Sequence, residues 1–390
     1  SVSGGSAEDC LFNGIVIRTK GAVTLTNFLA EDAMWDGIDI YNKNSPTNAK
    51  VTLTGITVDG NVGMGLTVTT NGAILITNLT ASQNQSGTYA IFLSNGTSPV
   101  NAGVTIKSTS GKVNEINYSV GTGLRIQTNG PVILDKVISK NSSGGSGASI
   151  STLGNLTITN SSFDGNRQYG VNGTVGGSLL INNTTANWNM DDDGMFITMT
   201  NDKPATITRS TFNYNDDGNG LTLYVNGTTL LNKVTCFRNA YGAYISNTNS
   251  NTPRMVTITN SMGMNDFSNN TDGYGLQVRN YGPVTLKGIT ANDNLEIGVM
   301  VYTYNESAAS HTTADLITAT GNGDTGIYIS NSTTGSTTAR GNITVQNSIA
   351  FNNGTGFVGD GMTLRTGGNV TVKNSAAVGN HGNGLDIDVN

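Results

Sequence analysis

The chain has 390 residues, of which 51 are glycine, while aromatic residues make up 6% and charged residues 12%. Its net charge of −6 argues against nucleic acid as a partner, because phosphate binding needs clustered Lys and Arg. No apolar run approaches the roughly 18 residues that a membrane-spanning helix requires. Asn, Thr and Ser separate short apolar runs throughout, and this composition predicts an extracellular or cell-surface protein without a membrane span.

A repeat is clearest between Gly65 and Asn84. Leu66 and Val68 alternate with threonines, which is the pattern of a half-buried strand. Asn71-Gly72 then supplies a bend, since both residue types tolerate positive φ, and a second apolar alternation begins after it. A third apolar step leads to Asn84. The repeat therefore predicts three short strands and no helix.

The same unit recurs along the whole chain with a period of about 26 residues, a spacing typical of solenoids. We expect the first strands to open at residues 15, 38, 66, 91, 124, 148, 171, 195, 221, 243, 276, 299, 327, 362 and 385. Second strands of the type VTLTN follow at residues 23, 51, 74, 156, 256, 284 and 370. Their β-branched side chains favour a pleated sheet.

An asparagine closes the third step of most repeats. The expected members are Asn61, Asn84, Asn141, Asn166, Asn189, Asn215, Asn239, Asn265, Asn294, Asn322, Asn352 and Asn380, with Asp9 and Asp32 in the same place in the first two turns. Stacked about 4.8 Å apart, such side chains form an amide ladder that also pairs buried backbone groups of the turns. Two adjacent carboxylates would repel, so we expect Asp9 and Asp32 to point outward or to bind a cation.

Together, the three strands, the glycine before the first strand, the VTLTN-type strand and the asparagine ladder resemble the right-handed parallel β-helix of pectin-lyase-like proteins. The resemblance covers essentially residues 1–390 and implies an all-β solenoid of about fourteen coils, which we expect to form a single domain without evident capping at either end. An all-β sandwich is the alternative, because it also contains many short strands at regular spacing. The β-helix scaffold carries lyases, hydrolases, adhesins and inert surface proteins, so it does not define a function.

The two cysteines, Cys10 and Cys236, fall about nine rungs apart, which is farther than a disulfide can span. We expect Cys236 to be a small core or turn residue.

Carboxylates provide the best candidate for a metal site. Asp191, Asp192, Asp193, Asp216 and Asp217 fall in the same turn of neighbouring repeats. Clustered oxygen ligands suit Ca²⁺, which takes six to eight of them. The alternatives are a solvated acidic turn and a pair of catalytic acids.

Catalysis has weaker support. Three segments partly resemble polygalacturonase motifs: Trp35-Asp36-Gly37, Asp191–Gly194 and Asn380-His381-Gly382. They fall too far apart along the repeats to act on one glycosidic bond. We therefore expect no enzymatic activity, and a pectinase-like lyase or hydrolase is the alternative.

Aromatic side chains and glycosylation sequons suggest that the protein binds glycans or carries them. Outward positions of the first strands carry Tyr41, Phe92, Phe196, Tyr224, Tyr244, Tyr302 and Tyr328, which either stack on sugars or stabilise neighbouring strands. About seventeen Asn-x-Ser/Thr sequons occur, and the candidates for glycosylation lie on inserted loops: Asn95, Asn226, Asn269, Asn305 and Asn331.

The chain begins at a second strand and stops after a first strand. We expect the two half-coils, with Ser1, Val2 and Ser3 at one end and Leu385, Ile387 and Val389 at the other, to complement each other between copies and to build a head-to-tail filament. The alternative is a fragment of a longer solenoid. The leading hypothesis is thus an extracellular structural protein that forms or decorates a surface layer or filament, and a polysaccharide-binding adhesin is the runner-up.

Overall fold

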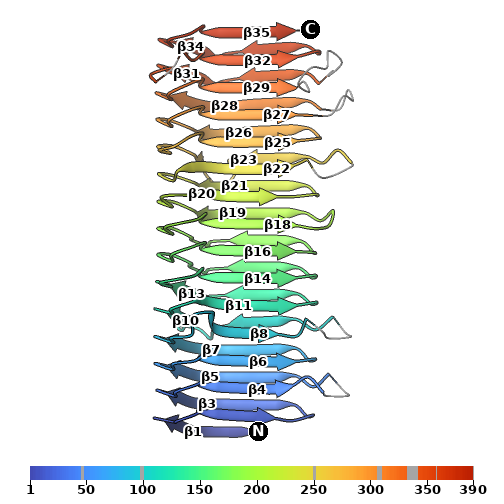
Figure 1. The fold of residues 1–390 in the computed structure, drawn as a ribbon. Coiled ribbons are helices and arrows are strands. Elements are labelled where there is room, and N and C mark those ends of the chain that lie inside the picture. The colour runs from blue at the N-terminus through green and yellow to red at the C-terminus, as the bar shows by residue number, and fades with distance from the viewer. Residues whose placement is uncertain are drawn as a thin grey trace. The chain divides into compact units, whose positions relative to one another are not determined.

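The computed structural model describes residues 1–44, 48–96, 101–248, 252–304, 310–331, 341–356 and 358–389. These residues form strands and turns, with no helix among them, and so no helix in the described part could cross a bilayer. They divide into two compact units, residues 1–192 and residues 193–390. Figure 1 labels the strands of the chain. The expectation of a single domain stays a prediction.

The first unit consists of strands stacked in two layers. One layer contains β2 (Ile15–Arg18), β4 (Ile38–Asn42), β6 (Leu66–Thr70), β8 (Tyr89–Ser94), β11 (Thr122–Thr128), β14 (Ala148–Thr152) and β16 (Val171–Val175). The other contains β1 (Val2–Glu8), β3 (Val23–Glu31), β5 (Val51–Asp59), β7 (Ile74–Ser82), β9 (Val104–Lys107), β10 (Asn114–Asn117), β12 (Val132–Asp135), β13 (Val137–Lys140), β15 (Leu156–Thr159) and β17 (Leu179–Asn182).

The second unit repeats this plan. Its first layer contains β18 (Met195–Met199), β20 (Asn219–Tyr224), β22 (Tyr241–Asn247), β25 (Leu276–Asn280), β27 (Val299–Thr303), β29 (Ile327–Asn331), β32 (Met362–Thr366) and β35 (Leu385–Val389). Its second layer contains β19 (Ala205–Thr211), β21 (Thr229–Thr235), β23 (Val256–Thr259), β24 (Asn265–Asp266), β26 (Val284–Thr290), β28 (Thr312–Thr320), β30 (Ile343–Gln346), β31 (Ile349–Phe351), β33 (Val370–Lys373) and β34 (Ala376–Val378).

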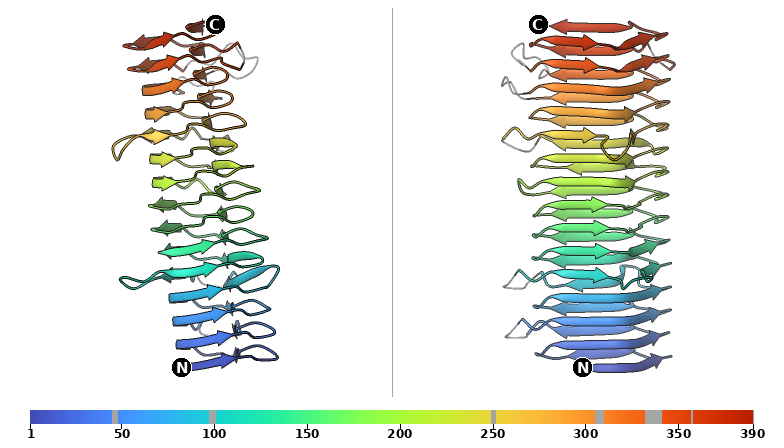
Figure 2. Two further views of the ribbon diagram at one scale, coloured as in Figure 1. Left: turned by 90° about the vertical axis from the view of Figure 1, so that its left-hand side faces the viewer. Right: turned by 180° about the vertical axis from the view of Figure 1, so that it is seen from behind.

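Within each unit, strands pair in parallel with their equivalents in neighbouring coils. In β3 and β5, Val23 lies opposite Val51 and Leu25 opposite Leu53, so identical positions of the repeat stack on one another. In the longer strands of the second layer, a single left-handed residue such as Asn27, with φ of 51°, bends the strand into the predicted second and third steps. Figure 2 shows the strands of each unit edge-on, with the turns on either side.

The core of each coil follows from the alternation of its strands. In β6 the side chains of Leu66 and Val68 are fully buried, while Thr67 and Thr69 remain partly exposed. The fold class is therefore confirmed as a parallel β-solenoid of about fourteen coils, and the first strands begin within two residues of the predicted positions.

The asparagine ladder is present and buried. In the first unit Asn61 bonds Asn84, and Asn166 bonds Asn189. In the second unit the ladder runs without a break through Asn215, Asn239, Asn270, Asn294, Asn322, Asn353 and Asn380. Asn322 illustrates the pattern, because its Nδ2 donates to Asn353 Oδ1 at 2.8 Å and its Oδ1 accepts from the backbone N–H of Asn294 at 3.1 Å.

Three members of the ladder were assigned wrongly from the sequence. Asn141 and Asn352 each lie one residue too early, in a left-handed conformation with φ of 58° and 51°, and Ser142 and Asn353 occupy the ladder positions. A side chain one residue away from the ladder points out of the core because successive residues face opposite sides.

The third error concerns Asn265. Its buried amide belongs to another position of the coil, where Oδ1 accepts from the backbone N–H of Val234 at 3.0 Å, and Asn270 fills the ladder. Asp9 and Asp32 are exposed, and both adopt the left-handed conformation with φ of 52° at the position before the ladder. They are therefore not members of the ladder either.

The repeated glycine before the first strand is explained by the ladder. A Cβ on Gly298 would lie 2.7 Å from Nδ2 of Asn322 and 2.7 Å from the backbone oxygen of Gly326 in the next coil. Gly37, Gly65, Gly147 and Gly275 face a ladder asparagine at the same 2.7 Å. The glycine is thus required for close packing against the ladder, and at these positions its φ is not in the left-handed region.

Candidate functional site

The outer face of the first layer in the second unit carries an unbroken series of aromatic and arginine side chains. Each of seven consecutive strands contributes one member, and these residues are called the aromatic ridge: Phe196, Tyr224, Tyr244, Arg279, Tyr302, Tyr328 and Arg365. They face outward because they alternate with buried residues such as Ile245 and Val278.

The rings of the ridge contact one another from coil to coil. The ring centroids of Phe196 and Tyr224 are 5.8 Å apart, and those of Tyr224 and Tyr244 are 5.7 Å apart. Further along, Tyr302 and Tyr328 lie 5.4 Å apart. The interplanar angles of 51° to 66° are those of tilted and edge-to-face pairs, which aromatic rings prefer over a face-to-face sandwich.

Arginine side chains bridge the positions that lack a ring. The guanidinium of Arg279 lies 5.8 Å from the ring centres of both Tyr244 and Tyr302, and that of Arg365 lies 5.8 Å from Tyr328. Among the described residues, neither arginine takes part in an ion pair, although Asp388 is the register neighbour of Arg365. The ridge therefore combines flat apolar faces with hydrogen-bond donors.

More tyrosines border the ridge. Tyr304 stacks 6.2 Å from Tyr302, and Tyr281 lies 6.1 Å from Tyr304. Partial burial raises the pKa of Tyr302 and of Tyr304 above the usual value, and the neighbouring tyrosines add to the shift at Tyr302. The hydroxyls of Tyr302 and Tyr304 thus stay protonated and able to donate at neutral pH.

The same face of the first unit carries isolated rings. Tyr41 is contacted by Arg18, whose guanidinium pairs with Asp39 at 2.5 Å. Phe92 stacks on Tyr89 of its own strand, with centroids 5.8 Å apart. The sequence correctly predicted that these rings and those of the ridge point outward, but it gave no sign that Arg279 and Arg365 complete the series.

The five predicted calcium ligands are divided between the two units. In the first unit, Asp191 pairs with Nε of Arg167 at 2.9 Å, and Asp192 is hydrogen-bonded to Tyr169. In the second unit, Asp193 is buried and its Oδ1 accepts from the backbone N–H of Asn219 at 2.8 Å, whereas Asp216 and Asp217 are exposed. No group of three or more His, Cys, Asp or Glu side chains in the described ranges is placed to hold a metal ion. The Ca²⁺ site stays a prediction.

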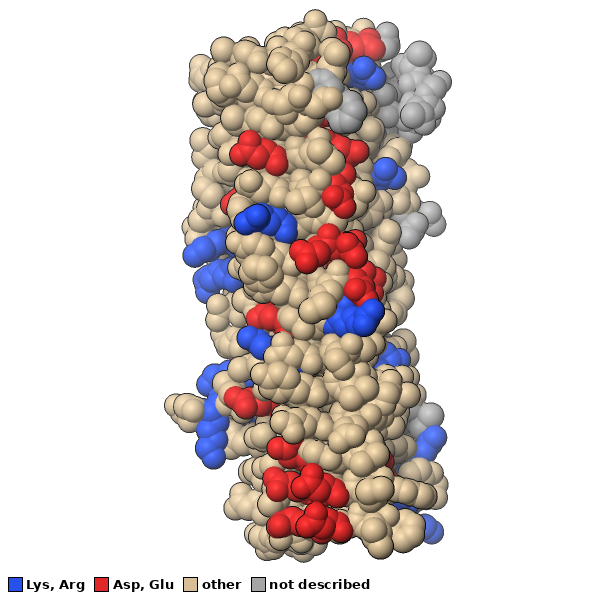
Figure 3. Space-filling model, turned by 60° about the vertical axis from the view of Figure 1, so that its left-hand side comes forward, with Lys and Arg blue, Asp and Glu red and all other residues tan. Residues whose placement is uncertain are grey.

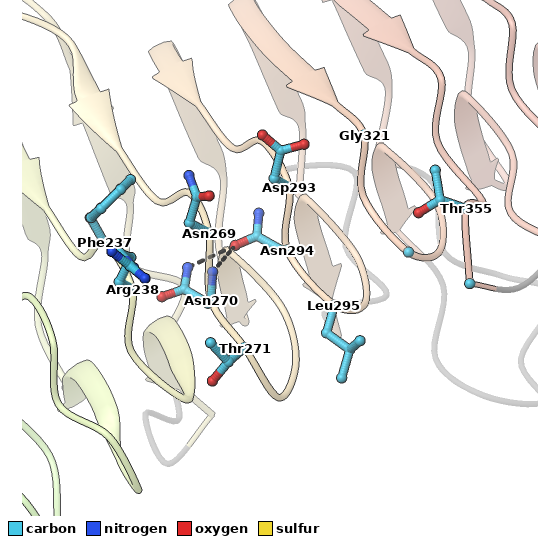
Figure 4. A pocket seen from close by; sticks show the side chains of 12 residues that line it. Phe237, Arg238, Asn269, Asn270, Thr271, Asp293, Asn294, Leu295, Gly321 and Thr355 are labelled. Carbon is cyan, nitrogen blue, oxygen red and sulfur yellow. Dashed lines mark hydrogen bonds between the residues drawn. The ribbon is translucent and has the colours of Figure 1, made fainter.

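A groove that the sequence did not suggest lies on the turns of the second unit. It has a volume of about 560 Å³ and is lined by Phe237, Arg238, Asp293 and Leu295 among others (Figure 4). Arg238 and Asp293 stand at left-handed positions that precede the ladder, with φ of 54° and 53°, so their side chains point out of the coil. The groove thus offers one cation, one carboxylate and an apolar wall, in a volume typical of small-ligand sites.

The cysteines and sequons have defined surroundings. Both cysteines are free thiols, and Cys236 is fully buried, as predicted, where desolvation raises its pKa. Asn95 and Asn331 are buried, and their Nδ2 atoms donate to backbone oxygens, so neither nitrogen is accessible for glycosylation in the folded chain. Asn226 and Asn269 are partly exposed, and Asn305 lies outside the described residues.

The side chains named for end-to-end assembly lie in the outermost strands. Exposed fractions are 43% for Val2, 43% for Leu385, 44% for Ile387 and 55% for Val389, and Ser1 and Ser3 are also exposed. These values describe single chains, so head-to-tail assembly stays a prediction.

Stacked parallel coils with an internal amide ladder define a β-helix repeat protein. Residues 102–261 match the family model described as "Right handed beta helix region", which agrees with the parallel β-solenoid described above and with the fold that the sequence resemblance implied. No significant match was found among curated proteins or among solved structures.

Proposed function

We propose that this protein is a non-catalytic extracellular protein that binds an extended polysaccharide along the aromatic ridge. The observation that carries the proposal is the continuity of the ridge: each of seven consecutive strands contributes one ring or guanidinium, and most neighbours lie 5.4–5.8 Å apart. An extended ligand needs contacts that repeat along one line, and the ridge offers them.

The chemistry of the ridge suits sugars. An aromatic face packs against the C–H groups of a pyranose ring, while tyrosine hydroxyls and guanidinium groups donate hydrogen bonds to its oxygens. Arg279 also offers a fork that fits a carboxylate or sulfate substituent. Hydrolysis of a glycosidic bond typically uses two carboxyl groups about 5–10 Å apart, and the ridge side chains are aromatic rings and guanidinium groups. The ridge is therefore a binding surface in this proposal.

The test is affinity electrophoresis of the folded chain in gels that contain neutral or acidic plant, algal or bacterial polysaccharides. We expect Tyr302→Ala to weaken binding about tenfold, because this factor corresponds to the binding free energy of one aromatic ring contact. Tyr302→Phe keeps the ring and should lose far less. Tyr41→Ala, an isolated ring on the same face of the first unit, is the matched control and should leave binding unchanged.

Thermal melting of each variant shows whether it is folded. Retardation that is the same for the wild type and for Tyr302→Ala would contradict the proposal. Release of reducing ends from a retarding polysaccharide would instead support the pectinase-like alternative.

A further inference from the structure

A second exposed surface lies on the turns of the first three coils, within the first unit. We call it the apolar turn patch, and its members, with exposed fractions of 43–78%, are Leu11, Phe12, Met34, Trp35 and Val62. The turns stack directly, since the backbone N–H of Met34 donates to the Cys10 oxygen at 2.8 Å and that of Val62 to the Ala33 oxygen at 2.9 Å. The rings of Phe12 and Trp35 meet edge to face at 5.6 Å.

Such a patch is unusual on a protein surface. Large apolar side chains that lie singly at the surface need no explanation, whereas contiguous ones typically mark an interaction site. Tryptophan in particular is enriched among the residues that dominate binding energy at protein interfaces. The patch therefore has the composition of a docking surface.

Carboxylates stand beside the patch on the same turns. In this acidic column, Glu8 lies in register with Glu31, and Glu31 with Asp59, while Asp9 and Asp32 follow directly in the chain. Figure 3 shows acidic side chains gathered on successive turns at the N-terminal end of this unit. Mutual repulsion is evident at Glu31, whose pKa is raised by desolvation and then by Asp59, Glu8 and Asp32. A partner that brings positive charge would relieve this repulsion.

The second unit carries a surface with the opposite charge and a similar apolar content. Its basic patch consists of Arg209 and Lys233, register neighbours at exposed bends with φ of 49° and 59°, together with Met262 and Met264, each 43% exposed. The methionines flank Gly263, whose Cβ would lie 3.3 Å from the Lys233 side chain, so the four residues are contiguous. Neither Arg209 nor Lys233 forms an ion pair with a described residue.

We propose that the apolar turn patch and acidic column of one copy bind the basic patch of a second copy. The carboxylates then face Arg209 and Lys233, and Trp35 packs on the flexible side chains of the methionines, which adapt well to an aromatic partner. The contact joins different surfaces of the two copies, so it leaves the same surfaces free for further copies. It uses side faces of the coils and is distinct from the predicted head-to-tail contact.

The experiment is sedimentation velocity of the full 390-residue chain over a range of concentrations and ionic strengths. We expect reversible association that weakens as salt rises, because exposed charges are screened. Glu31→Lys and Lys233→Glu should each weaken the association about tenfold or more, since like charges then face each other. Glu296→Lys and Lys203→Glu make the same charge changes at exposed positions elsewhere and should have little effect.

A mixture of the Glu31→Lys and Lys233→Glu variants tests the charge pairing directly. The reversed charge of the Glu31→Lys variant then faces the reversed charge of the Lys233→Glu variant, and the unaltered surfaces of the two chains also complement each other. Association should therefore be restored in the mixture at concentrations where each variant alone associates only weakly. Trp35→Ala should weaken association without changing its salt dependence.

Two results would overturn the proposal. A wild-type chain that stays monomeric at every concentration would do so and would leave the apolar turn patch to a different partner. Association that persists in all variants would overturn it as well, because another surface must then be responsible.

Discussion

At the scale of single residues, two bends in each coil require the left-handed conformation. Asparagine or glycine fills most of them, and both tolerate positive φ at low cost. Lys136, Arg209, Lys233 and Leu316 occupy equivalent bends with φ of 49–59°. For such side chains the left-handed conformation costs roughly 1–2 kcal/mol. The repeat thus keeps its backbone geometry even where the favoured residue is missing.

We therefore predict that Leu316→Asn stabilises the protein by roughly 0.5–1 kcal/mol, because Leu316 is 42% exposed and its φ of 57° suits asparagine. Chemical denaturation monitored by circular dichroism measures the change. Leu295→Asn is the control, since Leu295 is also exposed but does not adopt positive φ. Equal effects of the two substitutions would show that the bend carries no strain.

At the scale of the coil, the ladder and the glycine form one packing unit. Nδ2 of Asn322 bonds the next ladder residue and also the backbone oxygen of Ala291 at 3.0 Å, while Gly298 gives it the space to do so. A buried amide with all its partners is stabilising, but the same amide without them is costly. The glycine and the asparagine therefore depend on each other.

Gly298→Ala should lower the free energy of unfolding by about 1–3 kcal/mol, because the new Cβ would lie 2.7 Å from Asn322 Nδ2 and from the Gly326 oxygen. Gly87→Ala is the matched control, since a Cβ there meets nothing within 4 Å and should change stability by less than about 0.5 kcal/mol. Urea titrations of both variants give the comparison. A loss of stability at Gly87 equal to that at Gly298 would refute the packing explanation.

Some features of the coil were predictable from the sequence and others were not. The position of each first strand was predictable to within two residues, because an alternating apolar run, preceded in most coils by a glycine, marks it directly. The ladder was harder to place, since Asn352 and Asn353 are adjacent and only the backbone bend between them decides which one points inward. Arg279 was missed because its role depends on Tyr244 and Tyr302 of neighbouring coils, at distances that no single repeat reveals.

At the scale of the whole molecule, a net charge of −6 is unevenly distributed, and the acidic column concentrates part of it on adjacent coils. Burial and the neighbouring carboxylates raise the pKa of Glu31, and burial raises that of Asp59. A raised folded-state pKa means that the folded chain binds the proton more tightly than the unfolded chain. These groups therefore favour folding at low pH, and this contribution is lost as pH rises through the unfolded and then the folded pKa.

Accordingly, Glu31→Gln should be more stable than the wild type at pH 7, and the difference should disappear below pH about 4, where glutamate is protonated in both states. Thermal melts at low protein concentration, across this pH range, measure the difference without interference from association. Asp386→Asn, which removes a carboxylate outside the acidic column, should show no such gain. A wild type that matches or exceeds Glu31→Gln at neutral pH would rule out repulsion within the column.

The aromatic ridge gains one side chain from each coil it crosses, and this has a consequence for how the protein evolves. Duplication or loss of a single repeat changes the ridge in a whole step of about 4.8 Å, and the new coil packs on its neighbours with the same ladder and the same glycine. The length of the ridge is therefore proportional to the number of coils that it crosses. In the proposed function, the length of polysaccharide that the ridge contacts would then scale with the number of repeats, which unequal recombination can change while the packing of each coil stays the same.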